Sequence, residues 1–372
     1  MDIREPTPLL GGLSPAAFMR DIWQKRPFLI RQAIPGVVPP ATPKQLFELA
    51  SRDDVESRLV VRQGEDWSLQ HGPFERRQLP ALKKGDWTLL VQGVDLHLDA
   101  AHDLLQRFRW TSDARVDDLM ISFATDGGGV GAHIDSYDVF LLQVHGQRRW
   151  RVGPVEHPEF REGMPVRLLT EFEPTEEFVL EPGDMLYVPP RWGHDGIAVG
   201  ECMTCSIGYR TPMPTELARE ILQRVIDDIE SPDEEPHFKD APRSVTETPG
   251  LMPPALATFA QKAVARLLKD PHQFDRALGE IMSEPKPQVW FEDGQDWSAG
   301  QGVRLDRRTR MMYDPRHVFI NGEAFRVGGR DAKLMQRLAD QRRLDAKACA
   351  GFSADAWGAV AEWVSQGWAH PL

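Results

Sequence analysis

The sequence has little cysteine, no long apolar run and no excess of positive charge, and each shortage excludes a class of protein. Three cysteines among 372 residues are too few for the disulfide framework of a small secreted domain, and they fit a reducing compartment. No stretch approaches the roughly twenty consecutive apolar residues of a transmembrane helix. The formal net charge is -12, and an acidic chain is a poor general partner for nucleic acid.

The start of the chain lacks a leader pattern, because Met1-Asp2-Ile3 is not a basic segment followed by an apolar run. We therefore expect no signal peptide and a cytoplasmic location. Cys202 and Cys205 form a Cys-x-x-Cys pair, but no second pair exists to complete a zinc site. The pair lies in a predicted strand rather than at a helix start, so we expect no redox role either.

The bulk composition is that of an ordinary soluble globular protein. Hydrophobic residues make up 41% of the chain and charged residues 27%, both close to the average. A chain of 372 residues is too long for one small core, so we expect two or three domains.

One stretch has the pattern of a metal site, namely Asp126-Gly-Gly-Gly-Val-Gly-Ala-His133-Ile-Asp135. Residues i and i+2 of an extended strand point to the same face, so His133 and Asp135 present an imidazole and a carboxylate together. A third ligand from elsewhere, His194, would complete a facial triad of two histidines and one carboxylate. Such a triad leaves coordination positions open and suits ferrous iron. A second His-x-Asp, at His97 and Asp99, begins a predicted helix, where i and i+2 diverge; we interpret it as a surface pair.

The residues after Asp135 predict a series of strands that would place His194 beside His133 and Asp135. We expect strands over 139–144 and 148–152 joined by a turn at His145-Gly146-Gln147, and two later strands joined by a turn at Pro182-Gly183-Asp184. A small antiparallel barrel of such strands would bring His194 beside His133.

These motifs together resemble a known family. The chain resembles the JmjC-type, cupin-fold 2-oxoglutarate oxygenases in the following features: His133-x-Asp135…His194, Arg148 fifteen residues after the first ligand, and Pro182-Gly183-Asp184-x-x-Tyr187-x-Pro189-Pro190. It is similar, more narrowly, to the bacterial ribosomal oxygenases in its Gly-Gly-Gly-Val-Gly-x-His-x-Asp-x-Tyr-Asp-Val-Phe segment, in Gly146-x-Arg148-Arg149-Trp150, and in Trp23-Gln24-Lys25-x-Pro27. Members of that group hydroxylate an arginine of the large-subunit ribosomal protein L sixteen, and their eukaryotic relatives hydroxylate ribosomal histidines.

The resemblance implies a fold and a set of site residues. The implied fold is α+β: a double-stranded β-helix (cupin, jelly-roll) barrel, a helical dimerisation region and a C-terminal winged-helix module. The implied cofactors are Fe(II), 2-oxoglutarate and dioxygen. The expected residues are His133, Asp135 and His194 for the metal; Arg148, with weaker contributions from Ser122 and Thr204, for 2-oxoglutarate; and Asp118, Met120 and Tyr137 for the substrate arginine. Arg149 points to the other face of its strand, so only Arg148 can serve.

The second half of the chain predicts helices and then a different module. We expect a helix over 215–230 with a wide apolar stripe, an acidic, proline-rich linker over 231–250, and helices over 255–269 and 271–282. Together with the resemblance, these helices predict a homodimer. The expected domains are residues 1–212 for catalysis, 213–288 for dimerisation and 289–372 for the winged helix.

The last domain is predicted from one strong turn signal and two helices. Asn321-Gly322 is typical of a type I′ hairpin, and we expect strands over 304–313, 317–320 and 325–327 and helices over 331–342 and 353–365. This domain also contains a basic run, which comprises Arg304, Arg307, Arg308 and Arg310. Such a run could contact RNA, but it is more often a solvent-exposed face. We therefore expect no nucleic-acid binding.

Three other functions stay open at this point. The chain could hydroxylate a histidine, it could be an N-methyl demethylase of the same superfamily, or it could be a non-catalytic, cupin-like protein that docks on ribosomes. The intact triad argues against the last of these.

Overall fold

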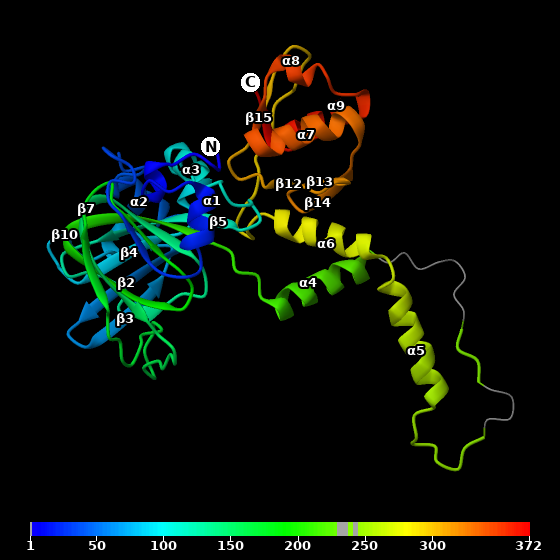
Figure 1. Ribbon diagram of the computed structural model, residues 1–372, viewed down its shortest axis with the longest axis horizontal. Coiled ribbons are helices and arrows are strands. Elements are labelled where there is room, and N and C mark those ends of the chain that lie inside the picture. The colour runs from blue at the N-terminus through cyan, green and yellow to red at the C-terminus, as the bar shows by residue number, and fades with distance from the viewer. Residues whose placement is uncertain (1, 229–236, 241–244) are drawn as a thin grey trace. The chain divides into compact units, whose positions relative to one another are not determined.

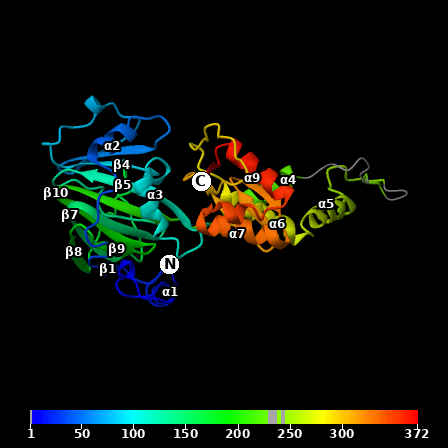
Figure 2. The same ribbon diagram turned by 90° about the horizontal axis from the view of Figure 1, so that it is seen from above.

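The computed structural model describes residues 2–228, 237–240 and 245–372, which form two compact units. The first unit comprises the chain up to Thr211, together with Lys286–Glu292 and Asp306–Arg308. The second unit comprises the remaining residues. Figures 1 and 2 show the strands of the first unit gathered together, with helices α1, α2 and α3 around them.

The helices of the first unit begin where the sequence places caps. The hydroxyl of Ser14 accepts a hydrogen bond from the backbone N–H of Ala17 at the start of α1, and Thr42 and Gln45 form a capping box on α2. Side-chain oxygens at these positions satisfy backbone donors that have no partner within the helix. The helices are α1 (Pro15–Asp21), α2 (Pro43–Leu49) and α3 (Asp99–Gln106), with short 3-10 helices η1 (Pro8–Leu10), η2 (Arg76–Gln78) and η3 (Val94–Leu96).

The strands of the first unit form a 10-stranded antiparallel sheet in the order β1-β9-β7-β10-β5-β4-β2-β3, with β6 paired to β10 and β8 paired to β7. This topology confirms the predicted cupin-type fold. The bounds are β1 (Phe28–Ile30), β2 (Ser57–Gln63), β3 (Asp66–His71), β4 (Trp87–Val91), β5 (Val116–Ala124), β6 (His133–Ile134), β7 (Val139–Pro154), β8 (Glu176–Leu180), β9 (Met185–Val188) and β10 (Trp192–Tyr209).

The two faces of the central strands β5, β7 and β10 have different surroundings. Side chains such as Ile121, Phe140 and Ile207 belong to the main hydrophobic core. The alternate residues face the other way, where an apolar cluster that includes Leu141 and Trp150 lies. Strand residues alternate between faces, so the polar members Ser122 and Thr204 share this second face, which is the one that holds the candidate site.

The predicted turn at His145-Gly146-Gln147 is wrong. These residues lie inside one 16-residue strand, β7, whose partner β10 shows a register shift between Val199 and Met203. Gly146 has φ of 60° and Gly200 has φ of 72°, a conformation that glycine adopts without strain. The two strands therefore bend together at this point, where the sequence pattern indicated a hairpin. The turn at Pro182-Gly183-Asp184, in contrast, does join β8 to β9.

The second unit contains helices and two three-stranded sheets. Its helices are α4 (Pro214–Asp227), α5 (Pro254–Leu267), α6 (Pro271–Ser283), α7 (Gly329–Gln341), α8 (Ala346–Cys349) and α9 (Ala354–Ser365). The sheets have the orders β15-β11-β16 and β12-β13-β14. Their strands are β11 (Val303–Leu305), β12 (Met311–Tyr313), β13 (His317–Ile320), β14 (Glu323–Arg326), β15 (Arg343–Leu344) and β16 (Ala369–Pro371).

Asn321 and Gly322 form the predicted two-residue turn, since Ile320 pairs with Glu323 and both turn residues have positive φ. The single strand predicted over 304–313 is wrong, because β11 and β12 lie in different sheets. Part of the predicted linker over 231–250 lies outside the described residues. None of the described helices is both long and apolar enough to cross a membrane.

Candidate active site

The fold brings His133 and His194 directly opposite each other. They are partners in the antiparallel pair β6–β10, and side chains of such partners lie on the same face a few ångströms apart. Their ring centroids are 4.1 Å apart. Asp135 follows β6 by one residue, and its Oδ2 lies 3.5 Å from Nε2 of His194 while its Oδ1 lies 4.0 Å from Nε2 of His133. The three residues that the sequence singled out therefore converge.

The geometry of these three side chains fits a metal ion. One ligand atom from each lies within 4.8 Å of the others. Nδ1 of His133 is 2.9 Å from the carbonyl oxygen of Gly131, and Nδ1 of His194 is 3.1 Å from that of Trp192. A ring that donates from Nδ1 leaves its Nε2 lone pair available for a metal. Two imidazole nitrogens and one carboxylate form the facial set that ferrous iron accepts.

The pKa shifts of the three side chains also fit a metal site. Burial, together with the neighbouring His194, lowers the pKa of His133 to about 4. Burial opposes protonation of His194 too, but Asp135 outweighs it through a hydrogen bond and its charge, and raises the pKa of His194. Burial also opposes ionisation of Asp135, yet the two histidines lower the pKa of that carboxyl. A neutral imidazole and a carboxylate are therefore ready to coordinate.

Arg148 is a buried cation on the same face, with 3% of its surface exposed. Its Nη1 donates to Oγ of Ser122 at 3.0 Å and to Oγ1 of Thr204 at 3.5 Å, and its Nη2 donates to the carbonyl oxygen of Gly196 at 3.2 Å. Burial lowers the pKa of its guanidinium. In the described part of the chain no carboxylate lies within ion-pair distance of Arg148, and its Nε has no hydrogen-bond partner. A buried guanidinium without a counterion fits an anionic ligand.

Residues that the sequence analysis missed shape the surroundings of Arg148. The guanidinium lies over the ring of Trp150, 5.1 Å from its centroid. A Cβ at Gly196 would lie 2.6 Å from that ring and 2.9 Å from Nε of Arg148, so only glycine fits there. Thr204 donates from Oγ1 to Oε1 of Gln143 at 2.9 Å. The alternation along β7 and β10 could have placed Trp150 and Gly196 on this face, but nothing local indicates Gln143.

Arg149 points to the opposite face of β7 from Arg148, as predicted. It is exposed and lies 3.9 Å from Glu177 in an ion pair on the other face of the sheet. His97, which follows η3, and Asp99, the first residue of α3, take no part in the triad. Asp99 is exposed as predicted, but His97 is half-buried, so the two do not form a surface pair. Cys202 and Cys205 are buried in β10 without a disulfide.

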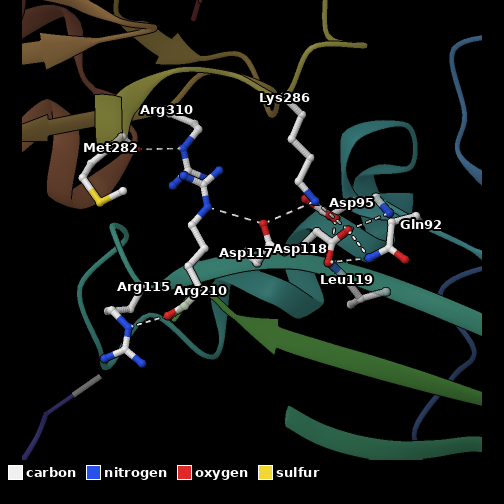
Figure 3. Close-up of polar contacts among 11 residues, drawn as sticks. Gln92, Asp95, Arg115, Asp117, Asp118, Leu119, Arg210, Met282, Lys286 and Arg310 are labelled. Carbon is white, nitrogen blue, oxygen red and sulfur yellow. Dashed lines mark hydrogen bonds and ion pairs between the residues drawn. The ribbon is translucent and has the colours of Figure 1, made fainter. Parts of the chain in front are cut away.

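The three residues predicted for substrate contact lie on β5 and just after the metal ligands. Met120 is partly buried and pairs with Ser206 across β5 and β10. Tyr137 is 39% exposed, and burial, with the charge of Asp135, raises the pKa of its hydroxyl. Asp118 is buried, and its carboxylate accepts hydrogen bonds from Gln92, from the backbone of Gly93 and from Lys286 (Figure 3).

Asp138 follows the metal-binding stretch, but its carboxylate is hydrogen-bonded to other side chains and does not belong to the triad. Its Oδ1 accepts a hydrogen bond from the hydroxyl of Tyr187 at 2.6 Å, and its Oδ2 accepts one from Nε2 of Gln24 at 2.9 Å. The backbone N–H of Gln24 donates to the Tyr187 hydroxyl at 2.7 Å. This network joins three motifs that are far apart in the sequence: the segment after α1, the start of β7 and strand β9.

The chain matches two protein families. Residues 103–217 match the JmjC domain, and residues 266–370 match the ROXA-like winged helix. Both predicted modules are therefore confirmed.

The chain is also similar to characterised proteins over most of its length. It is 36% identical to the ribosomal protein uL16 3-hydroxylase of Escherichia coli, over 82% of this chain and 84% of that protein. The crystal structure of Escherichia coli YcfD has a TM-score of 0.81 at 30% identity and covers 95% of this chain and 97% of that one. The structure of the ribosomal oxygenase YcfD in complex with cobalt and 2-oxoglutarate has a TM-score of 0.77 at 29% identity, covering 96% and 98%. The chain belongs to the JmjC-type ribosomal oxygenases.

Proposed function

We propose that this protein is an Fe(II)- and 2-oxoglutarate-dependent oxygenase that hydroxylates an arginine side chain of the large-subunit ribosomal protein uL16 (L sixteen). The observation that carries the proposal is the pair of sites on one barrel face: a triad of His133, Asp135 and His194, and a buried guanidinium that has no counterion among the described residues. The similarity to a uL16 3-hydroxylase supports the choice of substrate.

Different residues of the chain would bind the metal and 2-oxoglutarate. His133, Asp135 and His194 would hold the iron, which when bound supplies the chemistry that couples oxidative decarboxylation of 2-oxoglutarate to hydroxylation of an unactivated carbon. Arg148 would bind the far carboxylate of 2-oxoglutarate, because a planar guanidinium can grip a carboxylate with two parallel hydrogen bonds. Ser122 and Thr204, already bonded to Arg148, would fix its orientation and contact the same carboxylate.

A substrate arginine needs a carboxylate for its guanidinium and an apolar surface along its stem. We propose that Asp118 supplies the carboxylate and that Met120 and Tyr137 supply the surface. Asp118 and Met120 share a face of β5 with Ser122. Tyr137 follows the metal ligand Asp135 by two residues, and the charge of Asp118 also contributes to the raised pKa of its hydroxyl, which supports a location near both.

We also propose that two copies of the chain associate through the helical region 213–288, between a catalytic region 1–212 and a winged-helix region 289–372. On α4, Leu222 and Ile226 are 41% and 54% exposed and line a groove with Ala218 and Pro214. The described side chains of α5 are exposed as well, Phe259 among them. Apolar helix faces of this kind are typical of an interface.

We propose no nucleic-acid partner, because the basic run is largely paired within the chain: Arg307 binds Asp99, and Arg308 binds Asp306. A location in the cytoplasm, where ribosomal proteins are available, fits the proposed substrate.

The function is tested by incubating the protein with Fe(II), 2-oxoglutarate and recombinant uL16 under air, and measuring succinate and the mass of uL16 fragments. We expect succinate formation that rises with uL16 and a gain of one oxygen atom on one arginine. A His133→Ala variant, which lacks one metal ligand, should form neither product. Release of formaldehyde, or hydroxylation of a histidine alone, would contradict the proposal.

Dimer formation is tested by light scattering on the eluate of a sizing column. Leu222→Glu combined with Ile226→Glu should convert a dimer to a monomer, while Glu220→Lys on the same helix should leave the mass unchanged. A monomeric wild-type protein would contradict this part of the proposal.

A further inference from the structure

Lys286 lies far from the metal-binding stretch in the sequence, yet it contacts the strand that carries Asp118. It follows α6 by three residues and belongs to the short segment Lys286–Glu292 of the first unit. Its Nζ is 2.9 Å from Oδ2 of Asp118 and 3.3 Å from Oδ1 of Asp117 (Figure 3). The Lys286 side chain is 26% exposed. Burial opposes its charge, but Asp118 and Asp117 outweigh burial and raise its pKa.

The two oxygens of Asp118 have different environments. Oδ2 accepts hydrogen bonds from Lys286, from Nε2 of Gln92 at 2.8 Å and from the backbone N–H of Gly93 at 3.0 Å. Within the described residues, Oδ1 accepts a longer hydrogen bond from the same Gln92 amide, at 3.1 Å. Three donors occupy Oδ2, whereas Oδ1 only shares the Gln92 amide with it, so Oδ1 keeps the capacity to bind another donor.

Oδ1 of Asp118 lies over β10. A Cβ built on Gly208 would be 3.8 Å from it, so the glycine places no side chain against this oxygen of the buried carboxylate. Gly208 shares its strand face with Ser206 and Thr204. Thr204 is bonded to Arg148. The open oxygen of Asp118 therefore faces the same barrel face as the cation proposed for 2-oxoglutarate.

The cluster around Asp118 would carry too much negative charge without a lysine. Asp95, Asp117 and Asp118 lie together, and Asp95 accepts a hydrogen bond from the backbone N–H of Leu119 at 2.8 Å. Burial, with the charge of Asp118, raises the pKa of Asp95 to about 7. Asp117 has a second cation, Arg210, at 3.4 Å. The cation that reaches Asp118 itself is Lys286.

We propose that Lys286 is a positioning residue for substrate recognition. Its charge offsets that of Asp118, and with Gly93 and Gln92 it fixes the carboxylate so that Oδ1 points to the barrel face where a substrate guanidinium would bind. This inference rests on the proposed function, since it concerns the residue proposed to bind the arginine of uL16. Lys286 would then contribute to substrate affinity although it lies outside the strands of the barrel.

The opposite arrangement is that Lys286 occupies the place of the substrate cation and must leave when the substrate binds. The contacts favour positioning, because Lys286 binds the oxygen that is already bonded to Gly93 and Gln92, and it leaves the oxygen over Gly208 open. The two arrangements predict different behaviour of the lysine when uL16 is added.

The test measures kcat and KM for recombinant uL16 in the full-length, iron-loaded protein. We expect Lys286→Met to raise KM for uL16 about tenfold, the loss expected for one charge-assisted hydrogen bond, with kcat reduced less than about threefold. Lys286→Arg should restore most of the affinity. Arg307→Met is the matched control, because Arg307 also joins a short C-terminal segment to the first unit, through exposed Asp99; its KM should be unchanged.

A second pair of variants asks whether Lys286 acts through Asp118. In an Asp118→Asn background, Lys286→Met should raise KM by less than about twofold, since neighbouring residues in one network have non-additive effects. A full tenfold effect in that background, or an unchanged KM in the single variant, would overturn the inference. A wild-type protein that forms succinate but never modifies uL16 would instead overturn the proposed function.

The wild-type protein supplies a measurement that needs no variant. Lys286 should react slowly with an amine-acetylating reagent, followed by mass spectrometry, and saturating uL16 should leave its rate unchanged or lower. Faster acetylation of Lys286 in the presence of uL16 would mean that the substrate displaces the lysine, and would overturn the positioning role.

Discussion

Arg148, which is buried, and Lys286, which is half-buried, are two cations of the first unit with opposite surroundings. Lys286 has two carboxylates within ion-pair distance, Asp118 and Asp117. Arg148 is more deeply buried and is surrounded by hydroxyls, a carbonyl oxygen and an indole ring. A buried charge costs stability unless it is paired. In the proposed function, Arg148, which has no carboxylate partner among the described residues, binds a ligand, whereas Lys286, which has two, positions protein side chains.

The largest effect expected from this comparison is on catalysis. Arg148→Gln should reduce turnover of 2-oxoglutarate at low concentration more than about 100-fold, since removing a buried charge partner costs on the order of 3 kcal/mol of binding. The same change should leave the free energy of unfolding unchanged or raise it by about 1 kcal/mol, because it removes an unpaired buried charge. Kinetics and urea unfolding measure the two effects; a variant that loses stability as well as activity would break the comparison.

Lys286→Met should behave in the opposite way. It leaves Asp118 buried without its cation, so we expect a loss of about 2 kcal/mol in the free energy of unfolding, less than for a fully buried pair because the ammonium is partly exposed. Urea unfolding at neutral pH measures it, with Arg307→Met as the control for an exposed pair. A stability equal to that of the wild type would show that the pairing contributes nothing.

The carboxylates around Lys286 should give stability a pH dependence. Asp95 has a pKa raised from 3.8 to about 7, so the folded state binds this proton more tightly than the unfolded state. Its contribution is fully present below pH 4 and is lost as the pH rises through 7. Asp95→Asn should therefore be neutral at acid pH and more stable than the wild type by roughly 1–2 kcal/mol at pH 8. A difference that does not change with pH would contradict the assignment.

The smallest effect concerns a hydroxyl beside Arg148. Thr204→Val keeps the shape of the side chain but removes the oxygen that bonds Arg148 and Gln143. We expect KM for 2-oxoglutarate to rise about threefold, the loss of one weak, shared hydrogen bond, with KM for uL16 unchanged. Ser206→Ala, one step along the same face, is the matched control, and an equal effect there would argue against a role specific to Thr204.

The metal cluster could be predicted from sequence because its signals are local. Spacing of two residues places His133 beside Asp135, and the strand signals around Pro182-Gly183-Asp184 predict the return of His194. Alternation along β7 likewise separates Arg148 from Arg149. The resemblance to a family supplied the roles, which spacing alone does not give.

The surroundings of the site could not be predicted, because their partners are distant in the chain. Lys286 reaches Asp118 across 168 positions, and no pattern near either residue indicates the other. The sequence predicts a turn at Gly146 because a glycine between two apolar runs usually ends a strand. In the structure β7 continues through Gly146, opposite the bend at Gly200 in β10. The run 304–313 similarly has strand propensity at both ends, but β11 and β12 join different sheets.

The pairing of β7 with β10 has a consequence for which oxo acids the enzyme can use. His194 pairs with Val152 and Ala198 pairs with Arg148, so the metal ligand and the guanidinium start four residues apart on one pair of strands, a backbone separation of roughly 13 Å. Backbone hydrogen bonds fix that separation, and Arg148 is held toward the metal by Gly196. With a metal at the triad and the far carboxylate of 2-oxoglutarate on Arg148, as proposed, this separation would select for chain length: a diacid one carbon shorter or longer would reach one end and miss the other.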